Sequence, residues 1–393
     1  MRIPSLGVMP SHVIPLLALA KKLDRDRFEC WFMVNQQLHG LVEATGFRCV
    51  EIDRRSPENI DLELRALREV MPDVIIDDLS LTTAITSRIV GKPRISIVRT
   101  GTLPYEKKIE GYEHSSRLEI IFEEMKGKEL DLLAEWKPKN TSDLFLADMH
   151  IVPSIPSIES LPSELRGDES YVYSGSLHLS DEEVSYSVKE VPEFSVLPYD
   201  TIDDFIRQNR HRKIVFFTYG FARPSEISRR SRQCIKAILN NGASVITNIP
   251  YEVDESEKAF LLKGDFFPLS QICSQVDAVV HQCGNGMYNF QILNELPGIV
   301  LGTKRYDRDQ IARQLERLGA AVYLPADDED DHFHREFDKS IRVLLEDSSS
   351  LWHRQRNVLR ELKNELELTS NNFNLERVIE QSIERSERKR RSG

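Results

Sequence analysis

A histidine near the start of the chain stands where it could act as a base. His12 lies in the segment PSHVIP at positions 10–15, which leads into an amphipathic pattern that predicts a helix over residues 13–23. Ser11 is a candidate N-cap for this helix. At the edge of a parallel sheet, where α/β folds bind ligands, an imidazole that titrates near neutrality can accept a proton. A surface histidine in a first helical turn is the alternative interpretation.

Two adjacent carboxylates could support that histidine. Asp77 and Asp78 directly follow the apolar run Val74–Ile76, which predicts a buried strand. Side chains at the carboxyl end of such a strand face the ligand edge of the sheet. We therefore expect that Asp77 could orient His12, as the carboxylate of a catalytic dyad does. Turn or capping residues before a helix over residues 82–89 are an equally open interpretation.

Two more segments place polar groups and glycines after predicted strands. The run HQCGNGM at 281–287 joins a strand to a helix, and helix N-termini bind phosphates through their N–H groups. A tight turn without a ligand explains this Gly-x-Gly spacing equally well. Asp309 and Gln310 precede a helix predicted over residues 311–318, with Gly319 as its stop. They could cap this helix or bind sugar hydroxyls.

Composition and charge restrict the class of protein. The net charge of −11 over 393 residues argues against a broad nucleic-acid or anionic-membrane surface. The five cysteines have no CxxC spacing, which predicts no zinc site, and the acidic run Asp327–His334 reads as a solvated loop. We find no secretory signal pattern and no apolar run of about 18–20 residues, so we expect a cytoplasmic protein without a membrane span.

Short apolar runs alternate with helical patterns along the chain, which predicts an α/β fold with two doubly wound parallel sheets. The chain length and the acidic, proline-containing stretch 180–212 predict two domains, over residues 1–195 and 212–360, that face a central cleft. Residues 361–393 are expected to form a helix that packs back on the first domain, followed by a basic tail. The predicted strands are Val74–Ile76, Ile95–Val98, Phe145–Val152, Ile214–Phe217, Ser244–Ile246, Ala278–Val280, Ile299–Leu301 and Ala321–Leu324.

In this order, these segments resemble the GT-B-fold inverting glycosyltransferases of the UDP-glycosyltransferase (family 1) superfamily, bacterial natural-product or macrolide type. Residues 11–20, SHVIPLLALA, are similar to the family's opening GHxxPxLxLA. The run 281–286 resembles its HHGGAG donor signature, and Asp309-Gln310 matches its closing acidic-Gln pair. The resemblance implies two Rossmann-like domains, the first binding the acceptor and the second the nucleotide sugar.

The resemblance also implies roles for individual residues. His12 would deprotonate the acceptor and Asp77 would hold His12. The implied partners are a UDP- or dTDP-sugar and a small-molecule acceptor, with no nucleic acid, no cofactor and no metal ion, and a homodimer is compatible with this reading. The implied donor-binding residues are Gly220 at a strand end, Phe267 beside the nucleotide base, His281, Gln282, Gly284, Asn285 and Gly286 at the diphosphate, and Asp309 and Gln310 at the sugar.

Three departures from the family pattern alter the diphosphate pocket. Gln282 stands in place of the second histidine, Met287 in place of a hydroxyl residue, and Phe221 also lacks a hydroxyl. Backbone N–H groups would therefore carry most of the phosphate binding. Three alternatives stay open: a MurG-type transferase of a lipid-linked sugar, a catalytically degenerate nucleotide-binding subunit, and a nucleotide-sugar epimerase. The acceptor is expected at the loops Val34–His39 and Arg99–Leu118.

Overall fold

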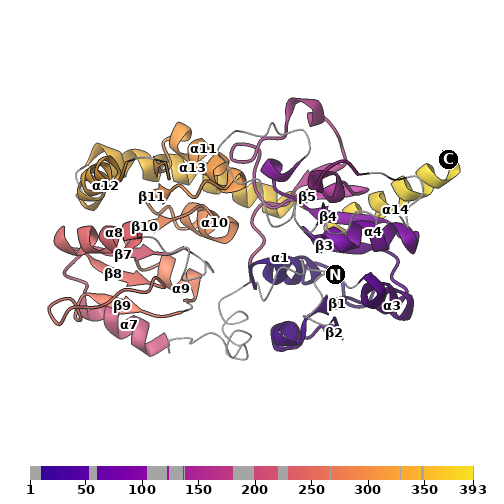
Figure 1. Cartoon of the computed structure of the whole chain (residues 1–393), viewed down its shortest axis with the longest axis horizontal. Coiled ribbons are helices and arrows are strands. Elements are labelled where there is room, and N and C mark those ends of the chain that lie inside the picture. The colour runs from indigo at the N-terminus through magenta and orange to yellow at the C-terminus, as the bar shows by residue number, and fades with distance from the viewer. Residues whose placement is uncertain are drawn as a thin grey trace. The chain divides into compact units, whose positions relative to one another are not determined.

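The computed structural model of the chain forms two compact units (Figure 1). The first unit contains Met1–Leu179 and Leu368–Gly393, and the second contains Ser180–Glu367. The structure describes residues 10–52, 60–103, 122–123, 136, 138–179, 199–219, 229–265, 267–327, 329–346 and 349–392. Of the segments singled out in the sequence, Gly220, Phe221, most of the boundary stretch and most of the loop Arg99–Leu118 lie outside these residues.

The described strands of the first unit all pair in parallel. β1 and β2 form one pair, and β3, β4, β5 and β6 form a four-stranded sheet in that order. Each residue of β3, β4 and β5 is buried, as expected for strands covered on both faces. The strands are β1 (Trp31–Val34), β2 (Arg48–Glu51), β3 (Ile75–Asp78), β4 (Arg94–Ile97), β5 (Met149–Val152) and β6 (Tyr171–Tyr173).

Helices connect and cover these strands. The buried Glu63 of helix α3 joins this helix to α4, because its carboxylate accepts hydrogen bonds at 2.6 Å from the hydroxyls of Thr82 and Thr86. The last helix packs against β4 and β5, and its Lys389 pairs with Asp148 at 2.8 Å. The helices are α1 (Pro10–Ala20), α2 (His39–Glu43), α3 (Ile60–Val70), α4 (Leu81–Ile89) and α14 (Leu375–Ser392), with short 3-10 turns at Gln36–Leu38, Thr100–Thr102, Thr141–Phe145 and Ser163–Leu165.

The second unit contains a six-stranded parallel sheet in the order β12-β11-β10-β7-β8-β9. The chain builds β7, β8 and β9 outward in one direction, then returns to build β10, β11 and β12 in the other. Ligands of such sheets bind at the point where the strand order reverses, here between β7 and β10. The strands are β7 (Ile214–Phe217), β8 (Ser244–Thr247), β9 (Leu261–Lys263), β10 (Ala278–His281), β11 (Gly298–Leu301) and β12 (Val322–Leu324).

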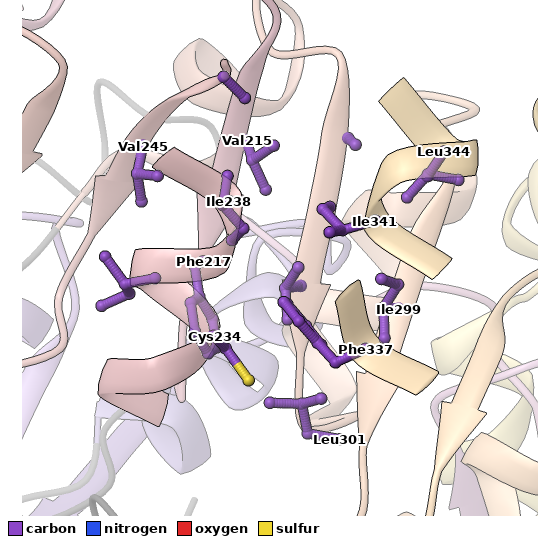
Figure 2. Close-up of a cluster of buried hydrophobic side chains, with 14 of the residues drawn as sticks. Val215, Phe217, Cys234, Ile238, Val245, Ile299, Leu301, Phe337, Ile341 and Leu344 are labelled. Atoms are coloured by element: carbon purple, nitrogen blue, oxygen red, sulfur yellow. The ribbon is translucent and has the colours of Figure 1, made fainter. Parts of the chain in front are cut away.

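Helices cover both faces of this sheet, because alternate strand residues point to opposite sides. Phe217 lies in a core with α8 and α12, which Figure 2 shows, whereas its neighbour Phe216 lies in a second core with α7, α9 and α10. The helices of this unit are α7 (Tyr199–Gln208), α8 (Arg229–Asn240), α9 (Leu269–Cys273), α10 (Asn285–Leu293), α11 (Tyr306–Leu318), α12 (Asp330–Leu345) and α13 (Ser350–Asn372), the last of which runs on into the first unit.

The parallel sheets confirm the predicted fold class, and the predicted elements occur with shifted ends. β3 extends to Asp78, so both carboxylates lie within the strand rather than after it. α1 begins at Pro10, so Ser11 lies inside its first turn and is not its N-cap. Gly319 ends α11 in the left-handed conformation, with φ 81°, as predicted. None of the helices in the described part of the chain is long and apolar enough to cross a membrane.

Candidate active site

In the first unit, the structure brings His12 to the end of β3. Nδ1 of His12 lies 3.2 Å from Oδ2 of Asp78, whose side chain is fully buried. The two groups are not aligned as a hydrogen bond, and neither Asp78 oxygen has a hydrogen-bond partner among the described residues. A buried carboxylate without donors is costly unless a charge or a proton compensates it. The neighbouring imidazole can supply either.

The prediction that Asp77 is the partner of His12 is wrong by one residue, since Asp78 is the carboxylate beside His12. Successive side chains of a strand point to opposite faces, so only one of the two carboxylates can face α1. Asp77 points to the other face, where its Oδ2 accepts a 2.6 Å bond from Nε of Arg94 on the adjacent strand β4. Ser80 N–H and the hydroxyl of Ser96 donate to its Oδ1 at 3.1 and 3.2 Å.

The Asp77–Arg94 pair has a structural role. Burial raises the pKa of the Asp77 carboxyl, while the charge and hydrogen bonds of Arg94 and the Ser80 N–H act in the opposite direction. Arg94 also donates to the Leu144 carbonyl at 2.6 Å and to the Ser80 carbonyl at 3.3 Å. It thereby ties the end of β3 to the start of α4 and to the 3-10 turn before β5, which fixes the strand end that carries Asp78.

Replacing these two neighbouring carboxylates should destabilise the protein to very different extents. Asp77→Asn leaves Arg94 as an uncompensated buried cation, so we expect the free energy of unfolding to fall by about 3–5 kcal/mol. Asp78→Asn removes a buried charge that has no donors, so the loss should be under about 1 kcal/mol. Urea unfolding of both variants measures this. A larger loss for Asp78→Asn than for Asp77→Asn would contradict the assignment.

In the second unit, His281 shapes the turn after β10. Its Nδ1 accepts the Cys283 N–H at 3.0 Å, and its Nε2 lies 2.8 Å from Oε1 of Gln291, so the ring proton is on Nε2. Burial lowers the pKa of His281 to about 4, against the opposing hydrogen bond with Gln291. Because both ring nitrogens are occupied within the protein, neither is left for the predicted contact with the donor. His281 holds Cys283 in the left-handed conformation, φ 59°.

Gln282 is also turned inward. Its side-chain amide donates to the carbonyl of Tyr219, just after β7, so it links the two strands on either side of the reversal in strand order. The side chain is largely buried. The prediction that Gln282 contacts the diphosphate is therefore replaced by a role in joining β7 to β10.

Space is open at the first turn of α10, directly after the turn that follows β10. Among the residues that the structure describes, a Cβ atom added to Gly284 or to Gly286 would meet no other heavy atom within 4 Å. Gly284 is the N-cap, and its carbonyl accepts the N–H groups of Met287 and Tyr288. Asn285 and Gly286 are the first helical residues, and the N–H groups of a first helical turn point out of the N-terminal end of the helix. Open space and helix N–H groups together suit an anion.

Phe267 and Asp309, two of the predicted donor-binding residues, make contacts within the protein instead. Phe267 is 4% exposed and packs edge-on against Phe216 with ring centres 5.9 Å apart, so its ring is not available to a nucleotide base. The Asp309 carboxylate accepts the N–H groups of Thr303 and Lys304 at 2.9 and 3.1 Å, which holds the turn before α11. Gln310 follows Asp309 and is half-buried.

Strand alternation could have shown that Asp77 and Asp78 face opposite sides of the sheet, which the spacing of motifs does not show. Once Asp77 and Asp78 are assigned to a strand, alternation requires that one of them faces the opposite side. The choice depends on Arg94 and Ser96 of the next strand, and the register pairs Asp77 with Ser96. This pairing is visible only in the folded sheet.

Two buried histidines should make stability depend on pH. Burial lowers the pKa of His150 and of His281 from about 6.5 to about 4, with Arg94 adding to the effect at His150. The unfolded chain therefore binds protons that the folded chain does not, and stability should fall as the pH drops from 6.5 to 4, by a few kcal/mol per histidine. Chemical unfolding at several pH values measures this.

His281→Gln should lose less stability than the wild type over the same pH range, although it is less stable at pH 7 because the turn bond is lost. His353→Gln, at an exposed histidine, serves as the control and should keep the wild-type slope. An unchanged slope in His281→Gln would refute the assignment.

Comparisons with known proteins find similarity to sugar transferases. No family model matches the chain. Over 162 residues, 39% of the chain, it is 25% identical to an aclacinomycin-T 2-deoxy-L-fucose transferase of Streptomyces galilaeus. Over 121 residues, 26% of the chain, it is 26% identical to a PGL/p-HBAD biosynthesis rhamnosyltransferase of Mycobacterium bovis. The matches span 36% and 27% of these two proteins, about a third of their length.

Solved structures match over nearly the whole chain. The spinosyn forosaminyltransferase SpnP has a TM-score of 0.66 at 16% identity and covers 94% of both chains. The spinosyn rhamnosyltransferase SpnG, complexed with thymidine diphosphate, has a TM-score of 0.62 at 14% identity and covers 93% of this chain and 95% of its own. The calicheamicin glycosyltransferase CalG4 has a TM-score of 0.59 at 15% identity and 94% coverage of both chains. The fold is thus the GT-B fold, as predicted.

Proposed function

We propose that the chain is an inverting glycosyltransferase that moves a sugar from a nucleotide-diphosphate sugar to a small-molecule acceptor. The observation that carries this proposal is His12 beside Asp78, a fully buried carboxylate without hydrogen-bond donors among the described residues. An imidazole held in this way suits a general base. The GT-B fold and the sugar-transferring activities named for the similar proteins support the same reaction.

The first unit would activate the acceptor. Asp78 holds the Nδ1 side of His12 and stabilises the positive charge that develops on the ring, as in a catalytic dyad. Nε2 takes the proton of the acceptor hydroxyl. The hydroxyl oxygen then forms a bond to the anomeric carbon of the donor as the bond from that carbon to the diphosphate oxygen breaks. Attack from the face opposite the leaving group inverts the anomeric centre.

The second unit would bind the donor and stabilise the leaving diphosphate. The N–H groups of Asn285 and Gly286 and the positive end of the α10 dipole offer fixed partial charges to the phosphate oxygens. The open space at Gly284 and Gly286 leaves room for the phosphates. Since His281 and Gln282 are occupied within the protein, the backbone must carry this interaction, as the departures from the family signature also require.

Thymidine diphosphate is the nucleotide we favour between the two that the sequence left open. SpnG and VinC were both solved with it, and both match this chain over more than nine-tenths of its length. A MurG-type transfer to or from a lipid-linked sugar, the second candidate, would depend on the segment Gly101–Met125, most of which lies outside the described residues.

Calorimetric titration of the full chain with dTDP, UDP and inorganic pyrophosphate tests the proposal. We expect dTDP to bind with one site per chain and more tightly than UDP, and pyrophosphate to bind weakly. Incubation with dTDP-sugars and a panel of aglycones, followed by mass spectrometry, then tests transfer. A folded protein that binds none of these nucleotides at about 1 mM would favour the degenerate-subunit alternative.

A further inference from the structure

Three side chains of the first unit, apart from the candidate active site, form a cluster suited to a metal ion. His39 and Glu43 begin and end α2, and Cys49 lies in β2. One ligand atom of each lies within 4.8 Å of the other two. Among the described residues, no other group of three histidine, cysteine or acidic side chains comes this close.

The fold explains why these three residues meet. His39 and Glu43 are four residues apart in a helix, which places them on one face, one above the other. Only Ala44–Phe47 separate α2 from β2, and a hydrogen bond from the Phe47 N–H to the Val42 carbonyl folds this connection back on the helix. Cys49 therefore returns beside the helix that has just ended.

Nε2 of His39 needs a partner that the described protein residues do not provide. This atom is buried and has no hydrogen-bond partner among them. A buried polar atom left unsatisfied costs about 1–3 kcal/mol, so such atoms are normally bound to something. A cation bound through this nitrogen would satisfy it.

The donor set indicates which cation. Imidazole nitrogen, carboxylate oxygen and thiolate sulfur together match zinc, whereas calcium and magnesium prefer oxygen ligands alone. Zinc bonds of about 2.0–2.3 Å place tetrahedral ligand atoms roughly 3–4 Å apart. The observed limit of 4.8 Å is about 1 Å wider, a gap that small rotations of the half-buried and exposed side chains can close.

We propose that His39, Glu43 and Cys49 bind one zinc ion, with water as a fourth ligand, and that the ion fastens α2 to β2. α2 lies shortly after β1, so the ion would brace the connection between the two strands of the β1–β2 pair. The proposal does not depend on glycosyl transfer, since it concerns a separate cluster and is tested by metal binding alone.

Cobalt titration of the metal-stripped full chain tests this site, because thiolate-bound cobalt absorbs in the near ultraviolet. We expect one equivalent of cobalt to bind with that absorption and zinc to displace it. Cys49→Ser should abolish the absorption. Glu43→Gln, at an exposed position that the fold does not need, should weaken zinc binding at least about tenfold, since even indirect supports of metal ligands contribute 10–100-fold.

Cys30→Ser is the matched control, because Cys30 is a half-buried thiol just before the neighbouring strand β1. It should keep the wild-type absorption and affinity. The proposal is overturned if the wild type binds no stoichiometric cobalt or zinc, if Cys30→Ser loses the absorption instead of Cys49→Ser, or if Glu43→Gln binds zinc as tightly as the wild type.

Discussion

Replacing His12 by alanine should lower the turnover of glycosyl transfer by about 10²–10⁴-fold, the usual contribution of a general base. The effect should lie in kcat and not in the affinity for dTDP, because the proposed nucleotide contacts lie in the second unit, whereas His12 belongs to the first. Because His12 is the group that compensates the buried Asp78 carboxylate, the variant should also lose some stability, so its unfolding midpoint is measured beside the kinetics. Steady-state kinetics with calorimetry of dTDP binding separates these two quantities.

Two further variants show whether the effect belongs to the dyad. Asp78→Asn should lower turnover less than His12→Ala and should shift the pH dependence of the rate, since the imidazolium loses its counter-charge. His353→Ala, at an exposed histidine in the second unit, should retain the wild-type rate. Turnover of His12→Ala within tenfold of the wild type would remove His12 from the mechanism.

Replacing Gly286 by valine should abolish nucleotide binding while the protein stays folded. A Cβ atom at this position meets no atom of the described residues within 4 Å, so this part of the fold has room for the side chain. The same open space is where we place the phosphates, so the branched side chain would occupy it and shield the first N–H groups of α10. We expect no saturable dTDP binding up to about 1 mM, and an unfolding midpoint close to that of the wild type.

Gly286→Ala is the graded control and should retain weakened binding. Gly302→Ala provides the opposite case, because a Cβ there would lie 2.6 Å from the backbone nitrogen of Ala326, so this variant should lose stability whatever it binds. If Gly286→Val is folded and binds dTDP with wild-type affinity, the phosphates do not lie at the start of α10.

The sequence predicts the strands of the sheet interiors well, because they are runs of β-branched and apolar residues buried on both faces. β7 agrees with its prediction at both ends. Four strands were missed. β2 and β9 carry charged residues such as Arg48 and Lys263, β6 has only three residues, and β1 (WFMV) has one β-branched residue where β7 (IVFF) has two. Periodicity in three or four such residues does not distinguish a strand from a loop.

The candidate site was predicted by region more reliably than by residue. The segments that carry His12, the two carboxylates and the Gly284–Gly286 turn do lie at strand ends or helix starts. Which side chains face outward depends on tertiary partners: Arg94 selects Asp77, and Gln291 and Cys283 occupy His281. The proposed zinc cluster joins residues whose spacing in the sequence matches no metal motif, so only the fold reveals it.

The first unit is made of two separate segments of the chain, and this has a consequence for its folding during synthesis. Its last helix, α14, belongs to residues 368–393, whereas the rest of the unit ends at Leu179, and the second unit is one continuous segment between them. On the ribosome, the second unit can therefore complete its sheet before the first is finished. At the 5–20 residues per second typical of synthesis, the first unit waits roughly 10–40 s for the helix that covers β4 and β5, and during that time this apolar surface is open to chaperones.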